Sequence, residues 1–271
     1  MSTQSKPLPV ETINNVVVNA IPNFAGLEKN TKPHLGHKIL NNCFSNVALI
    51  AQKNSGKTSA VFEMIKQCAN ENTKGVIFFV STLYNDDSYT NIITYLEKKK
   101  IPVVEYTSIF SESDGHDQLL EIVTDLKNDA MKRKADEKKK RLADMKGGCD
   151  CDGKPKYIFD HMEGLGEKPK KESKYIVPEY IFVIDDLSEE VKSKSLTVLL
   201  KKNRHFKCMT IISTQSNIDL SQSQKKQLNV WLIWKAEDKS KMKTVYNNAD
   251  IGGIMPFSYF MWMYTQATEP K

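Results

Sequence analysis

Short apolar runs alternate along the chain with segments of helical periodicity. Buried strands are predicted at 47–50, 75–81, 181–184, 209–212 and 230–235, with a further strand candidate at 102–106. A closing strand rich in aromatic residues is predicted at 258–264. Helices are predicted at 59–68, 89–100, 117–146, 196–202 and 236–248. Such an alternation of strands and helices indicates an α/β core.

The length of 271 residues suits one large α/β core, and a single domain with insertions is the simplest interpretation. Residues 1–35 are rich in Pro, Asn and Thr, contain a β-like run at 12–18, and are expected to form an N-terminal arm. Residues 36–271 would form the main domain. An insertion at about 117–176 combines a long helix, apolar at first and then basic, with a Gly-, Lys- and Pro-rich loop that has a β-like stretch at 157–159.

The most informative segment follows the first strand and reads Ala-Gln-Lys-Asn-Ser-Gly-Lys-Thr from Ala51 to Thr58. A loop of this kind presents backbone N–H groups and a helix N-terminus, which together attract phosphate. Gly56 would let the backbone approach the phosphates, Lys57 would neutralise them, and the Thr58 hydroxyl would join the shell of Mg²⁺. The predicted nucleotide-binding residues are Gln52, Lys53, Asn54, Ser55, Gly56, Lys57 and Thr58.

This loop departs from the pattern G-x-x-x-x-G-K-S/T at its first position, where Ala51 replaces glycine. If a positive φ is needed there, alanine costs about 1 kcal/mol, which weakens the motif without removing the phosphate pocket. The alternative is a chance Gly-Lys-Thr on a surface turn. The flanking strand and helix, and the acidic residues further along, favour a nucleotide-binding loop.

Two carboxylates follow the predicted strand at 181–184. Buried parallel strands deliver such residues to the carboxyl edge of a sheet, where ligands bind. In a nucleoside triphosphatase, Asp185 would hold Mg²⁺ through its water shell and Asp186 would polarise the attacking water. Glu189 and Glu190 are the alternatives for the second role. An apolar run before Asp-Asp also marks ordinary strand ends, so the interpretation depends on the phosphate loop upstream.

Further polar residues are expected at the same edge. Residues 81–87 follow one predicted strand, and Thr214 and Gln215 follow another. The Gln215 amide can hydrogen-bond the attacking water or the γ-phosphate, which makes it a candidate catalytic residue. Arg204 precedes that strand and would lie at the opposite edge if the strands are parallel. It is a candidate arginine finger for a neighbouring subunit, and a surface arginine beside several lysines is an equally good interpretation.

The net charge of +6 is unevenly distributed. Residues 127–174 contain fifteen Lys/Arg and ten Asp/Glu, so this segment carries +5 of the excess. A basic insertion on a nearly neutral core favours contact with an anionic partner, although solvated helix faces often have the same composition.

The five cysteines are odd in number and lack the spacing of a disulfide framework, so free thiols are expected. Cys149, Cys151 and His161 could bind zinc, but a structural site normally has four ligands, and surface thiols are favoured. The N-terminus lacks the apolar core of a signal peptide, and no apolar run approaches the roughly 18 residues that span a bilayer. We expect a compartment like the cytosol and no membrane contact.

Aromatic residues near the C-terminus could stack on nucleic-acid bases. Because they alternate with apolar neighbours in predicted strands, they are better explained as core. These residues are Trp231, Trp234, Tyr259, Phe260, Trp262 and Tyr264.

Taken in order, these motifs resemble the DNA-packaging ATPases of large DNA viruses, the poxvirus-type members of the FtsK–HerA superfamily of P-loop NTPases. The resemblance covers roughly residues 41–265. It rests on Gln-Lys-Asn-Ser-Gly-Lys-Thr at 52–58, Phe-Val-Ile-Asp-Asp-Leu at 182–187, Asn-Arg-His-Phe at 203–206 and Ile-Ile-Ser-Thr-Gln at 211–215. Two departures are Ala51 and Asp186, since much of the superfamily has glutamate as the second acid.

The resemblance implies a three-layer, ASCE/RecA-like P-loop fold with a mostly parallel central sheet, and an ATPase that uses ATP and Mg²⁺. It assigns nucleotide binding to Lys57 and Thr58, the Mg²⁺ and catalytic acids to Asp185 and Asp186, the polar sensor to Gln215 and a trans-acting role to Arg204.

The resemblance also implies assembly and location. It indicates a homo-oligomeric ring, pentamer or hexamer, around double-stranded DNA, with capsid or portal-vertex proteins as further partners. The expected location is the host-cell cytoplasm, in the viral factory, with the virion as a second location. The basic helical segment at 127–146 is a candidate contact for DNA or capsid, and a solvated helix is the alternative.

Three other functions remain open. Another DNA-translocating ATPase of the same superfamily would share these motifs and work without a capsid. A nucleotide-binding scaffold without turnover would account for Ala51 and Asp186. A small-molecule kinase would need a substrate lid and an acceptor pocket, for which the sequence offers no candidate.

Overall fold

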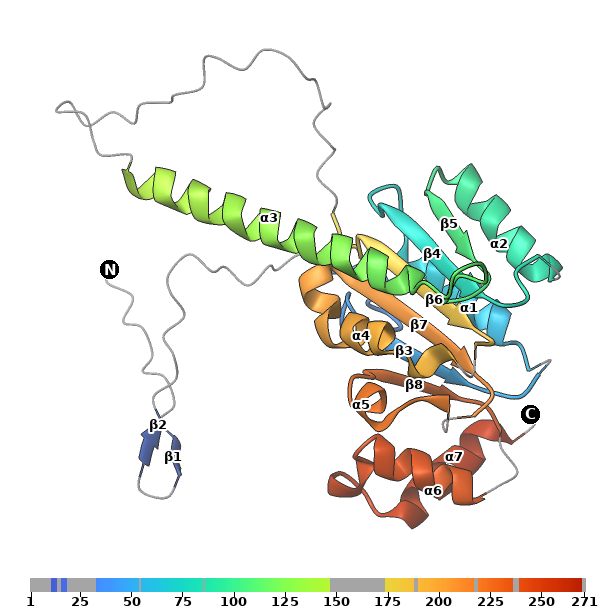
Figure 1. Cartoon of the computed structure of the whole chain (residues 1–271). Helices are drawn as coiled ribbons and strands as arrows, with labels where there is room; N and C mark the ends of the chain where they lie inside the picture. Colours follow the sequence, from blue (N-terminus) through green and yellow to red (C-terminus); the bar gives the residue numbers. More distant parts are fainter. Residues whose placement is uncertain are drawn as a thin grey trace. The chain divides into compact units, whose positions relative to one another are not determined.

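The computed structural model describes residues 11–13, 16–18, 33–53, 55–84, 86–146, 174–187, 190–216, 219–235 and 239–269. The chain divides into two compact units, Met1–Lys32 and Pro33–Lys271. In the first unit β1 (Glu11–Ile13) and β2 (Val16–Val18) form an antiparallel pair, so the single predicted β-like run is two short strands. All other helices and strands belong to the second unit (Figure 1).

The second unit is built on one six-stranded sheet in which neighbouring strands are parallel. Its strands are β3 (Asn46–Ile50), β4 (Gly75–Val80), β5 (Val103–Tyr106), β6 (Tyr180–Asp185), β7 (Cys208–Thr214) and β8 (Val230–Ile233). They lie in the order β5-β4-β6-β7-β3-β8. Each corresponds to a predicted strand. The strand before the phosphate loop, β3, thus lies two places from the strand that ends in the acids, β6.

Helices cover both faces of this sheet. They are α1 (Lys57–Cys68), α2 (Asp87–Lys98), α3 (Gln118–Lys146), α4 (Lys194–Phe206), α5 (Gln222–Lys225), α6 (Lys239–Asn248) and α7 (Phe257–Thr268). Val47 and Leu49 of β3 share a core with α1 and α2, whereas Ala48 shares the other core with α3 and α4. Side chains alternate along a strand, so one apolar run supplies both cores. The predicted α/β class with three layers is confirmed.

The two halves of α3 have different surroundings. Leu119, Val123 and Leu126 are buried in the core, whereas Met131 is 58% exposed. Arg133 anchors the helix near this change, because its guanidinium donates to a Glu179 carboxylate oxygen at 2.8 Å and to the His205 carbonyl at 3.2 Å. Beyond the sheet, α3 extends freely in Figure 1. The predicted change from a docked to a projecting half is confirmed.

The predicted closing strand at 258–264 is wrong, because these residues belong to α7. Pro256 precedes the helix, a position that its fixed φ suits. Phe257 and Phe260 are three residues apart and both face Tyr246 of α6, with ring centroids 5.2 and 5.6 Å away. The aromatic spacing therefore follows a helical period, and β8 ends the sheet.

This change of element alters the surroundings of the aromatic residues. Tyr259 and Trp262 are 52% and 57% exposed and stack on one another, so their assignment to the core is wrong. Trp231 and Trp234 do pack against the cores. Tyr264 is half-buried, and its hydroxyl donates to the Trp234 carbonyl at 2.8 Å.

Several expectations fall outside the described residues, namely those on Asn54, Cys149, Cys151, His161, Glu189 and the stretch at 157–159. Within the described ranges, Cys43, Cys68 and Cys208 have free thiols. The same ranges contain no helix with the length and apolar character needed to cross a membrane. They also contain no cluster of three or more His, Cys, Asp or Glu side chains that could hold a metal ion.

Candidate active site

The parallel registers bring the ends of β3, β6 and β7 to one edge of the sheet. Ile50 lies opposite Thr214, and Asp185 lies opposite Ser213. The residues after these strands meet the phosphate loop around a cleft of about 750 Å³. Its walls are Lys53, Ser55, Gly56, Lys57, Thr58, Ser59, Thr82, Asp86, Asp87, Ser88, Asp185, Asp186 and Gln215. Most of the predicted site residues are thus brought together.

The phosphate loop leads into α1 through Gly56, which has φ +87°. Glycine adopts this left-handed conformation without strain, whereas other residues rarely do. Among the described residues, no atom lies within 4 Å of the position that a Cβ would take, so this side of the loop is open to them. Gly56 is also the N-cap of α1, and as a glycine it offers no side chain to cap the helix. The first backbone N–H groups of α1 are therefore available to an anion.

Ala51 carries no backbone strain. Among the described residues other than glycine, positive φ is found at Lys100, Asp186, Lys207 and Asp250, so Ala51 is not one of them. Ala51 is buried, and its N–H donates to the Thr214 carbonyl at 3.2 Å. Position 51 therefore does not need the positive φ that would make alanine unfavourable there.

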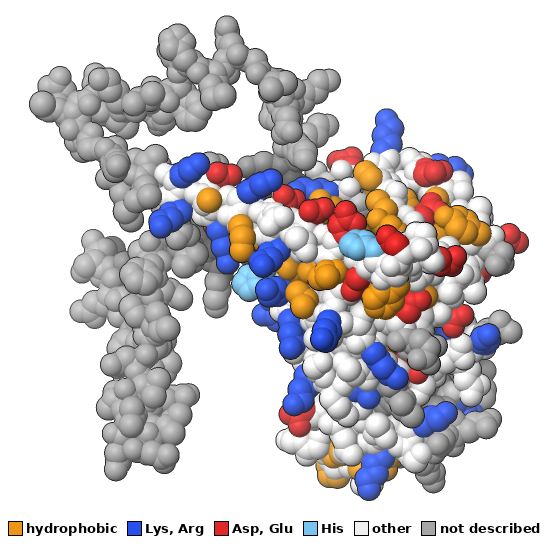
Figure 2. All heavy atoms as spheres, in the orientation of Figure 1, with side chains coloured by type: hydrophobic (Ala, Val, Ile, Leu, Met, Phe, Trp, Pro, Cys, Tyr) orange, Lys and Arg blue, Asp and Glu red, His pale blue; other side chains and the backbone are white. Residues whose placement is uncertain are grey.

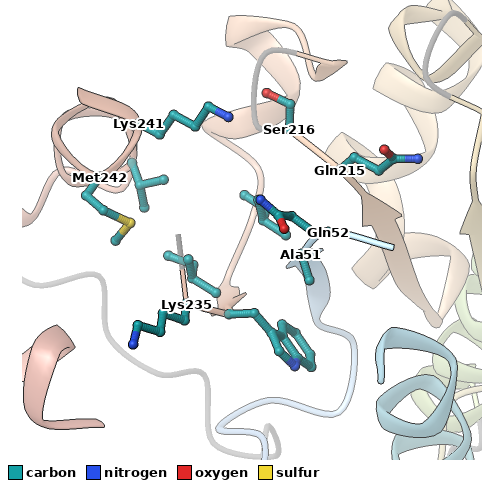
Figure 3. Close-up of a pocket in the computed structure, with 11 residues that line it drawn as sticks. Ala51, Gln52, Gln215, Ser216, Lys235, Lys241 and Met242 are labelled. Atoms are coloured by element: carbon teal, nitrogen blue, oxygen red, sulfur yellow. The ribbon is translucent and has the colours of Figure 1, made fainter. Parts of the chain in front are cut away.

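Gln52 does not line this cleft but belongs to a neighbouring pocket. Figure 3 shows it beside Ala51, with Gln215 and Ser216 on one side and Lys241 extending from α6. The pocket is otherwise mainly apolar, and its enclosed volume of about 40 Å³ suits a few water molecules rather than a nucleobase. Ser55 is tied to Gln52, because its hydroxyl donates to the Gln52 carbonyl at 2.7 Å. The backbone of Gln52 thus shapes the loop.

Asp185 is the most buried acid of the cleft, with 6% exposure. Its Oδ2 accepts a hydrogen bond of 2.6 Å from the hydroxyl of Tyr89, which is itself completely buried. Burial and the charge of Asp185 raise the pKa of Tyr89 far above its ordinary value, so the hydroxyl keeps its proton. Oδ1 of Asp185 is also buried and has no hydrogen-bond partner in the described part of the chain. One oxygen of this carboxylate is therefore hydrogen-bonded, and the other is buried without a partner among the described residues.

Asp186 has a backbone conformation that is uncommon for a residue with a side chain, with φ 56°. Aspartate tolerates this left-handed region better than most residues, and such conformations concentrate at functional sites. Its carbonyl accepts from the Ser81 hydroxyl at 3.0 Å, and its Oδ1 accepts from Gln215 Nε2 at 3.1 Å. The two residues predicted to handle the attacking water are therefore hydrogen-bonded to each other.

The chemistry of these residues suits Mg²⁺ with a bound nucleotide. Mg²⁺ prefers oxygen ligands, keeps several waters and is normally held by one or two protein oxygens together with phosphates. Thr58 and Asp185 line one cleft, and their hydroxyl and carboxylate oxygens match that preference. Lys53 and Lys57 in the same walls provide positive charge for the phosphates.

The alternative acid Glu190 is engaged elsewhere. Its carboxylate accepts from the Ser108 hydroxyl at 2.9 Å and from the Ile109 backbone N–H, and it does not line the cleft. The structure therefore favours Asp186 over Glu190. Asp86, Asp87 and Thr82 do line the cleft, which confirms the expectation that the segment after β4 reaches this edge.

Tyr89 is the residue at this site that sequence reasoning missed. Tyr89, Ile92 and Leu96 are all buried on one side of α2, so a helical core position explains Tyr89 equally well from sequence alone. Its partner Asp185 is 96 positions away in the chain. No local pattern links the two residues.

Arg204 lies away from the cleft, as predicted for parallel strands. It is exposed near the C-terminal end of α4 and lines a groove of about 370 Å³ with Lys201, His205 and Lys226. Asn46, the first residue of β3, lies in the same groove, which places it at the amino edge of the sheet. On the face drawn in Figure 2, Lys and Arg side chains gather over α4.

Comparison with known proteins gives structural likeness only. No family model matches the chain. No curated protein matches its sequence. A structure of the genome packaging NTPase B204 from Sulfolobus turreted icosahedral virus 2 with AMP aligns at 14% identity and a TM-score of 0.44, over 78% of this chain and 85% of that chain.

Two further structures of B204 align in the same way. The complex with ATP-gammaS gives 15% identity and a TM-score of 0.43, over 77% of this chain and 83% of that chain. The DNA-packaging ATPase B204 from Sulfolobus Turreted Icosahedral Virus gives 16% identity and a TM-score of 0.44, over 77% and 83%. Function is therefore inferred below from the residues of the cleft.

Proposed function

We propose that this protein is an ATP-hydrolysing motor that moves double-stranded DNA into a preformed capsid. The observation that carries the hydrolytic part is the single cleft in which Lys57, Thr58, Asp185, Asp186 and Gln215 come together from three neighbouring strand ends. The DNA and capsid parts rest on the resemblance of the motifs in the chain.

The residues of the cleft have distinct roles in this proposal. The N–H groups of the phosphate loop and Lys57 bind the β- and γ-phosphates of ATP. Thr58 and Asp185 would hold Mg²⁺, which when bound would neutralise charge on the phosphate oxygens. Gln215 and Asp186 hold the attacking water; Gln215 Nε2 donates a hydrogen bond to Asp186 Oδ1 at 3.1 Å.

Hydrolysis then needs one proton acceptor. The water oxygen attacks the γ-phosphorus while the bond from that phosphorus to the β-γ bridging oxygen breaks, and ADP leaves. The water proton passes to the Asp186 carboxylate, which returns it to solvent or to the released phosphate. The bond to Gln215 orients the carboxylate, and Asp186 is the only acid of the proposal that changes protonation.

Arg204 is proposed to act on a neighbouring subunit's nucleotide. Its position at the amino edge prevents it from serving the cleft of its own chain, and its exposure leaves it accessible to another copy. A ring of five or six subunits would place such an edge beside the next cleft. The guanidinium would then stabilise the charge that develops on the γ-phosphate.

The first test is steady-state ATPase activity of the full chain with and without duplex DNA, beside Lys57→Ala and Asp186→Asn. The motor proposal expects activity that rises with DNA, falls with increasing salt because backbone contacts release counterions, and disappears in both variants. Nucleotide binding without turnover, with or without DNA, would contradict it and favour a scaffold.

A mixing experiment tests the trans-acting arginine. Arg204→Ala subunits keep their own cleft, whereas Asp186→Asn subunits lack turnover but offer an intact Arg204. If the arginine acts across an interface, mixing two inactive variants restores part of the activity. Inactivity of the mixture, or full activity of Arg204→Ala alone, would remove Arg204 from the mechanism.

The scaffold alternative is weakened at both of its supports. It depended on Ala51 and Asp186 as signs of lost hydrolysis, but Ala51 has no positive φ and Asp186 is hydrogen-bonded to Gln215 within the cleft. A DNA-translocating ATPase without a capsid shares the whole cleft. Loading of DNA into purified empty capsids, compared with translocation on free DNA, distinguishes the two motors.

A further inference from the structure

Tyr89 reaches the candidate metal site from the interior of the protein. It is the third residue of α2, is completely buried, and packs edge-to-face against Phe78 of β4 with ring centroids 6.0 Å apart. Its hydroxyl donates to Oδ2 of Asp185 at 2.6 Å. A tyrosine held by packing on every side has little freedom, so the direction of this hydroxyl is fixed by the core.

The partner carboxylate would otherwise be free to rotate. The terminal torsion of an aspartate side chain has broad energy wells, so packing around Cβ does not fix its two oxygens. A short hydrogen bond to a charged acceptor is about twice as strong as a neutral one. The Tyr89 bond therefore sets which oxygen of Asp185 is occupied and which is left unpartnered.

We propose that Tyr89 is a positioning residue for the divalent cation: it holds Oδ2 of Asp185 so that Oδ1 is presented to the metal and its waters. This inference rests on the proposed function, since it assumes that the cleft binds a nucleotide with Mg²⁺. Oδ1 is buried without a partner among the described residues, which is an unfavourable arrangement for a carboxylate unless a ligand completes it.

The same contact joins the metal site to the first turn of α2. Asp86 caps this helix by accepting from the Ser88 N–H at 2.8 Å, and Asp86, Asp87 and Ser88 line the cleft immediately before Tyr89. A displacement of Asp185 would therefore be transmitted through Tyr89 to the cleft wall formed by α2. Partners of this kind behind a metal ligand typically change metal affinity 10- to 100-fold when they are removed.

The test is binding of Mn²⁺, used as a spectroscopic substitute for Mg²⁺, to the full chain saturated with ADP. Free Mn²⁺ is measured by electron paramagnetic resonance for the natural protein and for Tyr89→Phe, which removes one oxygen atom and keeps the ring. We expect affinity for Mn²⁺ to fall about 10- to 100-fold. Affinity for ADP in the presence of a chelator should stay unchanged, because Tyr89 acts on the metal ligand.

Tyr246→Phe is the matched control. It removes a tyrosine hydroxyl whose hydrogen bond to the Met255 carbonyl is also 2.6 Å, but Tyr246 lies outside the cleft. Its Mn²⁺ affinity should equal that of the natural protein. Thermal unfolding of both variants shows whether each is folded at the temperature of the titration. An equal loss of Mn²⁺ affinity in both variants would overturn the proposal.

A second measurement separates positioning from general damage. If Tyr89 acts through Asp185, Tyr89→Phe should reduce Mn²⁺ affinity further by less than about twofold in a chain that already carries Asp185→Asn. Equal fold losses in the two backgrounds would refute a role through Asp185. Unchanged Mn²⁺ affinity in a folded Tyr89→Phe protein that still hydrolyses ATP would refute the inference and leave the proposed function intact. Absence of Mn²⁺ and ADP binding in the natural protein would refute both.

Discussion

Both edges of the sheet carry carboxylates and lysines, but among the described residues these charges are paired with one another at the amino edge and largely unpaired at the carboxyl edge. At the amino edge, Glu179 accepts from Lys74, Arg133 and Lys207 at 2.8, 2.8 and 2.9 Å, so its charge is compensated within the protein. At the carboxyl edge, Asp185 keeps an oxygen without a partner, and Lys57 forms no ion pair with any described residue.

This difference separates residues that stabilise the fold from residues kept for a ligand. Folding alone would favour pairing a half-buried carboxylate with nearby cations, as at Glu179. The carboxyl edge instead lines a cleft with four carboxylates and two lysines. In the proposed function, a bound nucleotide with its metal would supply the missing charges of both signs.

The largest expected effect that tests this contrast is the loss of turnover in Asp186→Asn. Removing a general base lowers the rate of hydrolysis by about 10²- to 10⁴-fold. Asparagine also tolerates the left-handed backbone of Asp186, so nucleotide binding should be retained. Phosphate release and binding of a fluorescent ATP analogue measure the two properties. Glu190→Gln is the control and should keep its turnover. Loss of turnover in Glu190→Gln but not in Asp186→Asn would assign the general base to Glu190.

A smaller effect is expected from replacing one lysine of each edge by alanine. Lys57→Ala should weaken ATP binding about 10- to 100-fold, because a charge-assisted contact to phosphate contributes roughly 1.5 to 3 kcal/mol. Lys74→Ala removes a lysine that is paired with Glu179 and should leave ATP affinity unchanged. Isothermal titration calorimetry measures both. Equal losses would mean that the two edges are not functionally distinct.

Gly56 can be compared with Gly115, because an alanine would be similarly strained at both positions. Gly56 and Gly115 have φ +87° and +69°, and in the described part of the chain no atom lies within 4 Å of where a Cβ would stand at either glycine. Alanine at either position should cost about 1 to 2 kcal/mol of unfolding free energy. Only Gly56→Ala should also weaken ATP binding, since Gly56 lines the cleft. Denaturant unfolding and nucleotide titration check the two parts; identical nucleotide affinities would place the phosphates elsewhere.

The smallest effect is expected at the compensated edge. Burial alone would raise the pKa of Glu179, but hydrogen bonds from Lys74 and Lys207 outweigh it, so the pKa of this carboxyl is lowered. Its ion pairs therefore stabilise the fold above the unfolded-state glutamate pKa of about 4.3, and this contribution is lost as pH falls through the lower folded-state value. Glu179→Gln should reduce the unfolding free energy by about 1 to 2 kcal/mol at pH 7. This value lies between the effects typical of breaking an exposed ion pair and a buried one.

The acid side of the stability curve provides the check on Glu179. Chemical unfolding of the natural protein and of Glu179→Gln should converge as the pH falls through the lowered folded-state pKa of Glu179, because below it the carboxyl is protonated in both folded and unfolded chains. ATPase activity at pH 7 should be the same for both. A constant difference in stability across all pH values would contradict the ion-pair explanation.

Local patterns predicted the six strands and the phosphate loop because both depend on neighbouring residues. Each buried strand is a continuous apolar run, and the polar residues that follow it must lie at the edge of a parallel sheet. The same reasoning failed at 258–264, where alternating aromatic residues suit a strand or a helix equally well from sequence. There the rings of Phe257 and Phe260 pack on Tyr246 from α6, and this tertiary contact selects the helix.

The sequence by itself determined which side chains are candidates for binding phosphate and a divalent cation, because residue type and order along the chain specify the loop, its helix and the two acids. Only the tertiary structure decided how these groups are held. Strand order placed Asp185 two strands from the phosphate loop, left Arg204 at the far edge and put the Tyr89 hydroxyl on Asp185 across 96 positions. Such contacts depend on how distant segments pack, and no local pattern in the chain specifies which distant residues will meet.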